Sequence, residues 1–277
     1  LVPIGVAPAG PPPGRLPGVQ QLSWAGVDVA VLVREASPGE ARPAPPQSGR
    51  GYVAPGPHEH PPARVTASRV EGRGASGPIT TLGDPLPITG APAMDRLGEA
   101  VHRFLAADGW AVPSDDRHRR AARLLQAWAV AGALTPDALV AAADRLRGWA
   151  DGRWPGSVWR REWPLAYVVG AGDPEPAPGE EASPRPGPGT IVAGTADLII
   201  EAAEGLVLVD HKTFACGIEE AVARAANYSG QLGAYCRALS RATGKPVVGT
   251  FIHLPVQGCV VPVSTNGPAH LLANGQA

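Results

Sequence analysis

Cysteine is scarce in this chain of 277 residues, which contains three, Cys216, Cys236 and Cys259. Their number is odd and no CxxC spacing occurs, which argues against a disulfide framework, a zinc site and an iron–sulfur cluster. Unpaired cysteines are typical of a reducing compartment, so we expect a cytoplasmic protein. Neither a signal-peptide pattern nor an apolar run near the ~20 residues of a membrane span is present, and we expect no membrane partner.

Positive charge is not in surplus either, because the formal net charge is −1. The net charge therefore gives no indication of a nucleic-acid partner, and any contact with DNA must come from local patches of positive charge. A GxxxxGK[ST] phosphate loop is also missing, so no ATPase is assigned to this chain. ATP would act only through a motor outside it.

Methionine and lysine are almost absent. Met94 is the only methionine and the chain begins at Leu1, which leads us to expect a piece of a longer polypeptide. Of the 24 basic residues, Lys212 and Lys245 are the two lysines. In a chain that otherwise uses arginine, a lysine beside acidic residues suggests a specific need, because a compact ammonium can hold a water molecule and change its pKa.

Proline and glycine are abundant, with 32 and 35 residues, which favours long irregular segments. We expect three of them: residues 1–90, a mobile insertion at 170–189 and a tail at 264–277. Within the first segment, the run from Val27 to Val33 is a strand candidate. His58 and His60 fit a solvated loop better than a metal site, because no further ligand types gather there.

Residues 91–263 show the periodicity of a packed α/β domain. Apolar residues at 3–4 spacing predict a helix from residue 93, and β-branched runs predict strands. The expected order is helix 94–105, helices 116–133 and 135–151, strand 154–169, a hairpin at 190–213, helix 218–243 and strand 247–254. The sheet should be mixed, because the hairpin is antiparallel while the last strand arrives through a helical crossover.

Charged residues interrupt the apolar hairpin. Asp210 and Lys212 share one strand face, and His211 points to the other. If Glu201 pairs with Leu206 across the turn, then Asp197 lies opposite Asp210, with Cβ atoms roughly 4.5–5.5 Å apart. Two converging carboxylates repel each other unless a cation lies between them. A hard divalent ion, Mg²⁺ or Mn²⁺, suits such oxygen ligands best.

The spacing Asp197, twelve residues, then Asp-His-Lys at 210–212 resembles the D…(D/E)xK signature of the PD-(D/E)XK nuclease superfamily. His102, in GEAVH, and the QxxxY formed by Gln231 and Tyr235 are similar to the RecB-like branch. The match extends over residues 94–263 and is similar to the nuclease domain that ends UvrD-type helicase–nucleases of the AddA/RecB class. This resemblance implies a restriction-endonuclease-like fold with an α-β-β-β-α-β core flanked by helices.

The resemblance also implies a set of site residues. His102, Asp197, Asp210 and the backbone carbonyl of His211 would bind Mg²⁺, with Mn²⁺ as an alternative, and Lys212 would orient the attacking water. Gln231 and Tyr235 would support the site or touch the DNA backbone. Two further residues stay open: Tyr228 has either that role or a packing role, and Glu162 binds a second ion or, as the sequence favours, has a structural or solvated role.

The function implied by the resemblance is metal-dependent hydrolysis of single-stranded DNA during the processing of DNA ends for repair and recombination. The expected partners are DNA, helicase domains of the same polypeptide and a second helicase–nuclease subunit. Residues 1–90 would then be a linker or the remnant of a helicase domain, in a nucleoid-associated protein of the bacterial cytoplasm. The alternative is a catalytically silent nuclease-like module with a structural or DNA-binding role.

Overall fold

A computed structural model of the chain describes residues 18–24, 27–33, 63–70, 72, 74–109, 111–173 and 186–265. The chain divides into two compact units, Leu1–His58 and Glu59–Ala277, which are described separately. The expected histidine-bearing loop at His58 and His60, most of the expected insertion at 170–189 and nearly all of the expected tail at 264–277 lie outside the described residues.

The first unit contains a β-hairpin. Strands β1 (Gly18–Trp24) and β2 (Val27–Val33) pair antiparallel along their full length, from Gly18↔Val33 to Trp24↔Val27. The predicted strand at 27–33 is confirmed with the same bounds. Its partner was not predicted, because GVQQLSW has no regular alternation of apolar and polar residues to mark it as a strand.

The second unit is a mixed sheet with helices on both faces. Its helices are α1 Met94–Ala107, α2 Ser114–Ala127, α3 Pro136–Arg153, α4 Ile218–Ala225 and α5 Ser229–Thr243, with 3₁₀ turns η1 Ala67–Arg69 and η2 Ala226–Tyr228. Its strands are β3 Arg64–Thr66, β4 Thr80–Thr81, β5 Val158–Val168, β6 Ile191–Ala202, β7 Gly205–His211, β8 Val247–Leu254 and β9 Cys259–Pro262.

The sheet has seven strands in the order β3-β6-β7-β8-β9-β4, and β5 pairs with β6. The β5–β6 and β6–β7 pairs are antiparallel, whereas β8 lies parallel to β7 because the chain reaches it through α4 and α5. The predicted α-β-β-β-α-β order is therefore confirmed by α1, β5, β6, β7, the α4–α5 segment and β8. The arrangement is a mixed α/β sheet of the restriction-endonuclease-like kind.

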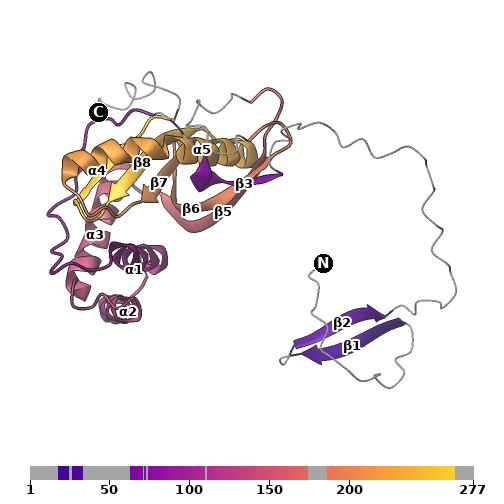
Figure 1. The fold of residues 1–277 in the computed structure, drawn as a ribbon, viewed down its shortest axis with the longest axis horizontal. Helices are drawn as coiled ribbons and strands as arrows, with labels where there is room; N and C mark the ends of the chain where they lie inside the picture. The colour runs from indigo at the N-terminus through magenta and orange to yellow at the C-terminus, as the bar shows by residue number, and fades with distance from the viewer. Residues whose placement is uncertain are drawn as a thin grey trace, which may run out of the picture. The chain divides into compact units, whose positions relative to one another are not determined.

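Two apolar cores hold the layers together. On one face of the sheet, α1, α2 and α3 pack against side chains of β6 and β7 such as Leu198 and Val209. On the other face, α5 covers a second set that includes Ile199 and Leu208. Successive residues of the same strand therefore face different cores, as the pleat requires. Figure 1 shows the sheet between α1–α3 on one side and α4–α5 on the other.

Two details differ from the sequence prediction. The helix expected over 218–243 is interrupted by η2, which places Tyr228 beside the end of β7 rather than on the face of one continuous helix. The main unit also begins before residue 91, because β3 and β4 belong to its sheet. Strands of two or three residues carry no periodic signal, and only tertiary pairing defines them. Finally, no helix of the described part is long and apolar enough to cross a membrane.

Candidate active site

The register of the central hairpin determines the position of the acidic residues. Glu201 pairs with Leu206, as predicted, and the regular pairing continues to Leu198↔Val209. Asp197 and Asp210 are the next residues on the two strands, just beyond this pairing. A hydrogen bond holds the two strands at this level, because the backbone N–H of His211 donates to Oδ2 of Asp197 at 2.7 Å. The Glu201–Leu206 pairing on which the predicted opposition of the two carboxylates depends is thus confirmed, and the two carboxylates are close enough for their charges to interact.

Asp210 is 1 % exposed and lies at the centre of a polar network on the α5 side of the sheet. The ammonium of Lys212 lies 2.8 Å from its Oδ2. On the other oxygen, the side-chain amide of Gln231 donates to Oδ1 at 2.8 Å. The same amide lies 3.4 Å from the hydroxyl of Tyr235. Gln231 therefore orients the acid of the DxK motif directly, and Tyr235 acts on it through Gln231.

Tyr235 reaches this network because β6 has a glycine where the ring passes. A Cβ atom built on Gly194 would lie 2.7 Å from the tyrosine hydroxyl and 2.8 Å from Cε1 of its ring. Real Cβ atoms essentially never come so close, so any other residue at 194 would displace the ring. The glycine that precedes Thr195-Ala-Asp197 in the sequence therefore permits α5 to pack tightly on β6.

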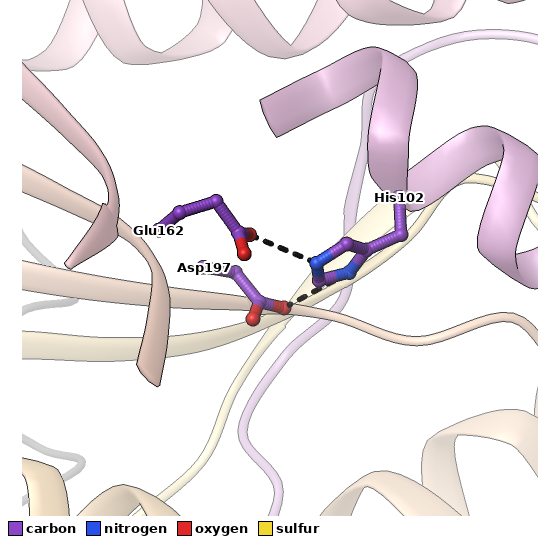
Figure 2. A group of neighbouring side chains, drawn as sticks. All are labelled: His102, Glu162 and Asp197. Carbon is purple, nitrogen blue, oxygen red and sulfur yellow. Dashed lines mark hydrogen bonds and ion pairs between the residues drawn. The ribbon is translucent and has the colours of Figure 1, made fainter. Parts of the chain in front are cut away.

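His102 comes to the site from α1, on the opposite flank. Its Nε2 lies 2.9 Å from Oε1 of Glu162, and its Nδ1 lies 3.7 Å from Oδ2 of Asp197 (Figure 2). The close approach of α1 depends on Gly98, where a Cβ would lie 2.4 Å from Oγ1 of Thr213. Because His102 follows Gly98 by about one helical turn, this contact places the imidazole over the end of β7.

Glu162 lies in the middle of β5 with a positive φ of 49°. Such a φ is uncommon outside glycine and is frequent at functional sites. The residues on either side of it pair with those on either side of Asp197, so Glu162 stands opposite that carboxylate across the strands. The sequence favoured a structural or solvated role for Glu162, because the alternating pattern of β5 does not indicate a positive φ at this position. In the structure its carboxylate points at His102 (Figure 2).

Among the described residues, His102, Glu162 and Asp197 form the one group of three metal-ligating side chains whose ligand atoms all lie within 4.8 Å of one another. We call it the acid–histidine cluster. Asp210 is the neighbour of this cluster rather than a member, because its two oxygens are turned to Lys212 and Gln231. The structure thus brings all the predicted ligand side chains to one region and adds Glu162.

Burial and mutual repulsion define the electrostatics. Burial, and then the charge of Asp210, raise the pKa of Asp197 to about 7. For Lys212, burial alone would lower the pKa, but the charge and the hydrogen bond of Asp210 outweigh it and raise the pKa of the ammonium. Burial and the charge of Asp210 also raise the pKa of Tyr235 to about 12. The site therefore holds excess negative charge that a cation would neutralise.

The side chain of His211 points away from the DxK face, as predicted. Its Nδ1 lies 3.1 Å from Nδ1 of His253, the residue beside it on the parallel strand β8. Burial lowers the pKa of both imidazoles, to about 3 for His253. A neutral pair can share one proton in a hydrogen bond, which ties β7 to β8 directly behind the acids. His253 was not predicted as part of the site, because it follows an ordinary apolar strand pattern.

Tyr228 has the supporting position that the sequence left open. The ammonium of Lys212 lies 4.5 Å from the centroid of its ring, and Phe214 lies beside the same ring with 6.2 Å between centroids. A cation over an aromatic face is held there electrostatically. Lys212 is thus fixed from two sides, by the carboxylate of Asp210 and by the phenol ring.

The donor set suits a hard divalent cation. Carboxylates and one imidazole are ligands that Mg²⁺ and Mn²⁺ accept, whereas no cysteine lies in the acid–histidine cluster. One buried oxygen of the neighbouring network, Oε1 of Gln231, has no hydrogen-bond partner among the described residues, and the one neighbour of Asp210 Oδ2 that is described is the ammonium of Lys212. Buried oxygens of this kind are normally satisfied, so an additional ligand fits this position.

Comparison with known proteins agrees with this geometry. The chain is 36 % identical over 121 residues to an ATP-dependent helicase/nuclease subunit of Desulforudis audaxviator (strain MP104C), and the match covers 42 % of this chain and 10 % of that protein. It is 31 % identical over 94 residues to the protein of the same name from Pelotomaculum thermopropionicum (strain DSM 13744 / JCM 10971 / SI), covering 34 % and 7 %. The chain thus spans a tenth or less of these relatives.

A family model matches a larger part of the chain. The model of the PD-(D/E)XK nuclease superfamily matches residues 81–264, from β4 to just beyond β9. This range contains every residue of the acid–histidine cluster, the Asp210–Lys212 pair and the QxxxY pair. The match extends over more than half of the chain, and the chain belongs to the PD-(D/E)XK nuclease superfamily.

Proposed function

We propose that the chain is a deoxyribonuclease domain that hydrolyses phosphodiester bonds of single-stranded DNA with the help of a divalent cation, Mg²⁺ or Mn²⁺. The observation that carries this proposal is the convergence of His102, Glu162 and Asp197 within 4.8 Å beside the ion pair of Asp210 and Lys212. Superfamily membership supports nuclease chemistry, and the donor set supports a hard cation.

His102, Asp197, Asp210 and the backbone carbonyl of His211 would hold the cation, with Glu162 as an additional ligand. When bound, such a cation lowers the pKa of water and polarises a phosphoryl oxygen. Glu162 and Asp197 contact the imidazole from two sides and so fix its ring. Burial, and then the charge of Asp210, raise the pKa of Asp197, and a cation at this position would offset both effects by stabilising the carboxylate.

Lys212 would orient the attacking water and offset the negative charge that develops on the phosphorus in the transition state. Its ammonium is preorganised for both tasks, because Asp210 and Tyr228 hold it in place. Gln231 keeps Asp210 in its rotamer through the 2.8 Å hydrogen bond. Groups that are fixed before the reaction stabilise developing charge without reorganising, which is usually a large part of catalysis.

The setting of this activity is inferred from the relatives. Both are named as subunits of an ATP-dependent helicase/nuclease. We place the domain in a polypeptide with helicase motor domains that use ATP and feed it a separated strand, together with a second helicase–nuclease subunit. Work of this kind belongs to DNA end processing in repair and recombination, in the nucleoid of the bacterial cytoplasm.

Cleavage of an end-labelled single-stranded oligonucleotide by the 277-residue chain tests the proposal, in Mg²⁺, in Mn²⁺ and in a chelator. Asp210→Ala and Lys212→Ala should each lower the rate by at least ~10²-fold. Lys245→Ala is the matched control, since it removes the other lysine of the chain, on the exposed segment after α5. Thermal unfolding verifies that each variant is folded.

Undiminished cleavage in Asp210→Ala and Lys212→Ala would contradict the assignment of the site. A chain that binds the oligonucleotide but cuts nothing in either metal would instead support the alternative, a silent nuclease-like module with a DNA-binding role.

A further inference from the structure

A pocket with a mostly apolar lining lies beside the residues that follow the DxK motif. Its volume is about 510 Å³, within the ~300–1,000 Å³ that small-molecule sites occupy. Ile88, Ala91 and Met94 line it from the segment that leads into α1. Phe214 and Cys216 line it from the segment between β7 and α4. The aromatic ring of Phe214 makes the pocket suitable for a flat, largely apolar group.

Two ring contacts connect the pocket to Lys212. The centroids of the Phe214 and Tyr228 rings are 6.2 Å apart, and the ammonium of Lys212 lies 4.5 Å from the same tyrosine centroid. The Phe214 ring is therefore no more than about 11 Å from the ammonium. This distance equals about three nucleotides at the ~3.4 Å that each occupies along a stacked strand. A strand whose scissile phosphate lies at Lys212 thus has a base within reach of the pocket.

The walls of the pocket belong to the same elements that build the active site. A Cβ atom on Gly98 would lie 2.4 Å from Oγ1 of Thr213, so α1 meets the chain at the residue between Lys212 and Phe214. Met94 begins α1 about one turn before Gly98. The helix that carries His102 therefore also carries one wall of the pocket.

A buried amide fixes the shape of the other wall. Gln257, in the turn between β8 and β9, is 8 % exposed. Its Nε2 donates to the carbonyl oxygens of Phe214 at 3.1 Å and of Cys216 at 2.9 Å. The segment that presents the Phe214 ring is thus held before any ligand arrives.

Two helices begin at the pocket. Met94 is the first residue of α1, and Gly217, which also lines the pocket, is the N-cap of α4. No side chain caps either helix, and the partial positive charge of a free helix N-terminus favours a phosphate. The exposed carboxylates of the two first turns, Asp95, Glu219 and Glu220, do not line the pocket. An apolar lining next to two such helix ends fits a nucleotide better than an apolar side chain.

We propose that this pocket is a base-binding subsite, which takes one base of the single strand within about three nucleotides of the scissile phosphate and stacks it on the Phe214 ring. The inference rests on the proposed function and identifies how the substrate strand is held beside the site. Bases stack on aromatic faces with little regard to sequence. A base inside a duplex is already stacked and paired, so the pocket selects single strands.

The thiol of Cys216 reports on the occupancy of the pocket. It lines the pocket and is half-buried, whereas burial raises the pKa of the Cys236 thiol to about 12, and Cys259 is buried. Iodoacetamide at pH 8 should therefore modify Cys216 first. In a chelator, a saturating oligothymidylate should slow this modification several-fold, as measured by peptide mass spectrometry. An abasic oligonucleotide of the same length should not slow it, because it offers sugars and phosphates but no base.

Binding of the 277-residue chain to a labelled oligothymidylate, followed by fluorescence anisotropy in a chelator, tests the pocket without cleavage. Ala91→Trp fills the pocket from an exposed position and should raise Kd by about 5- to 100-fold, the range expected for the loss of one stacked base. Phe214→Leu removes the ring and should also raise Kd. Ala93→Trp is the matched control and should leave Kd unchanged, since Ala93 is exposed on the same segment but does not line the pocket.

Two results would overturn the base-binding subsite while nuclease function stands. One is protection of Cys216 that is equal for the oligothymidylate and the abasic strand, or absent for both. The other is an unchanged Kd in Ala91→Trp. If the unsubstituted chain binds no single strand at all, the proposed function fails and the subsite fails with it.

Discussion

The raised pKa of Asp197 predicts that the metal-free domain is destabilised by its own active site. The rise from 3.8 to about 7 corresponds to about 4 kcal/mol at ~1.36 kcal/mol per pKa unit, which is a ceiling because Asp210 shares the repulsion. Between pH ~4 and ~7 the folded state keeps a proton that the unfolded state has lost. The free energy of unfolding therefore falls as pH rises through this window and levels off above it.

Replacing Asp197 by asparagine removes the ionisation and keeps an oxygen that can accept from the His211 N–H. In a chelator, we expect Asp197→Asn to be more stable than the unsubstituted chain by up to about 4 kcal/mol at pH 8 and by less than about 2 kcal/mol at pH 5. Urea unfolding at the two pH values measures the difference. Glu204→Gln is the control, because Glu204 is an exposed carboxylate in the turn between β6 and β7.

A bound metal should make the unsubstituted chain more stable than Asp197→Asn, which reverses the order expected in a chelator. Mg²⁺ or Mn²⁺ should stabilise the unsubstituted chain, more strongly at pH 8 than at pH 5 because binding needs the deprotonated carboxylate, and should stabilise Asp197→Asn much less. The reasoning is refuted if the free energy of unfolding has the same pH dependence in both proteins in the chelator. Ionisation of the Asp197 carboxylate would then not destabilise the folded state.

Two further predictions concern neighbouring residues. Tyr228→Ala should lower the cleavage rate by about 5- to 30-fold, which corresponds to the loss of a partly desolvated cation–π contact to Lys212. Tyr228→Phe keeps the ring and should cut at nearly the normal rate. Equal losses in the two variants would assign the effect to the hydroxyl instead. Asp108→Ala should lower the free energy of unfolding, measured in urea, by ~3–5 kcal/mol. The reason is that the buried carboxylate pairs with Arg117 at 2.7 Å and with Arg147 at 3.0 Å. A loss below about 1 kcal/mol would show that the two arginines find other partners.

Much of the site could be predicted because its residues carry local signals. The hairpin has two β-branched runs around a tight turn, so its register follows from the pairing of Glu201 with Leu206, and this register brings both strands to Asp197 and Asp210 at the same end of the hairpin. Gln231 and Tyr235 are one helical turn apart, and the structure places both next to Asp210. In each case, the geometry is determined by residues close together in the sequence.

The parts that escaped prediction depend on contacts between distant segments. Glu162 comes to His102 because the backbone of β5 adopts a positive φ there, which no periodicity encodes. His253 matters through its partner on the neighbouring strand, 42 residues away. Tyr228 reaches Lys212 because η2 interrupts the expected helix. Tertiary packing selects each of these conformations, and one sequence does not reveal it.

The most direct test of the account is to locate the cation itself. Crystals of the 277-residue chain grown with Mn²⁺ and measured near the manganese edge should show an anomalous peak bounded by the side chains of His102, Asp197 and Asp210. Glu162 should lie at the same peak or at a second one beside it. A structure at saturating Mn²⁺ with no peak at the cluster, or with a peak at another place only, would contradict the central claim that this cluster holds the catalytic metal.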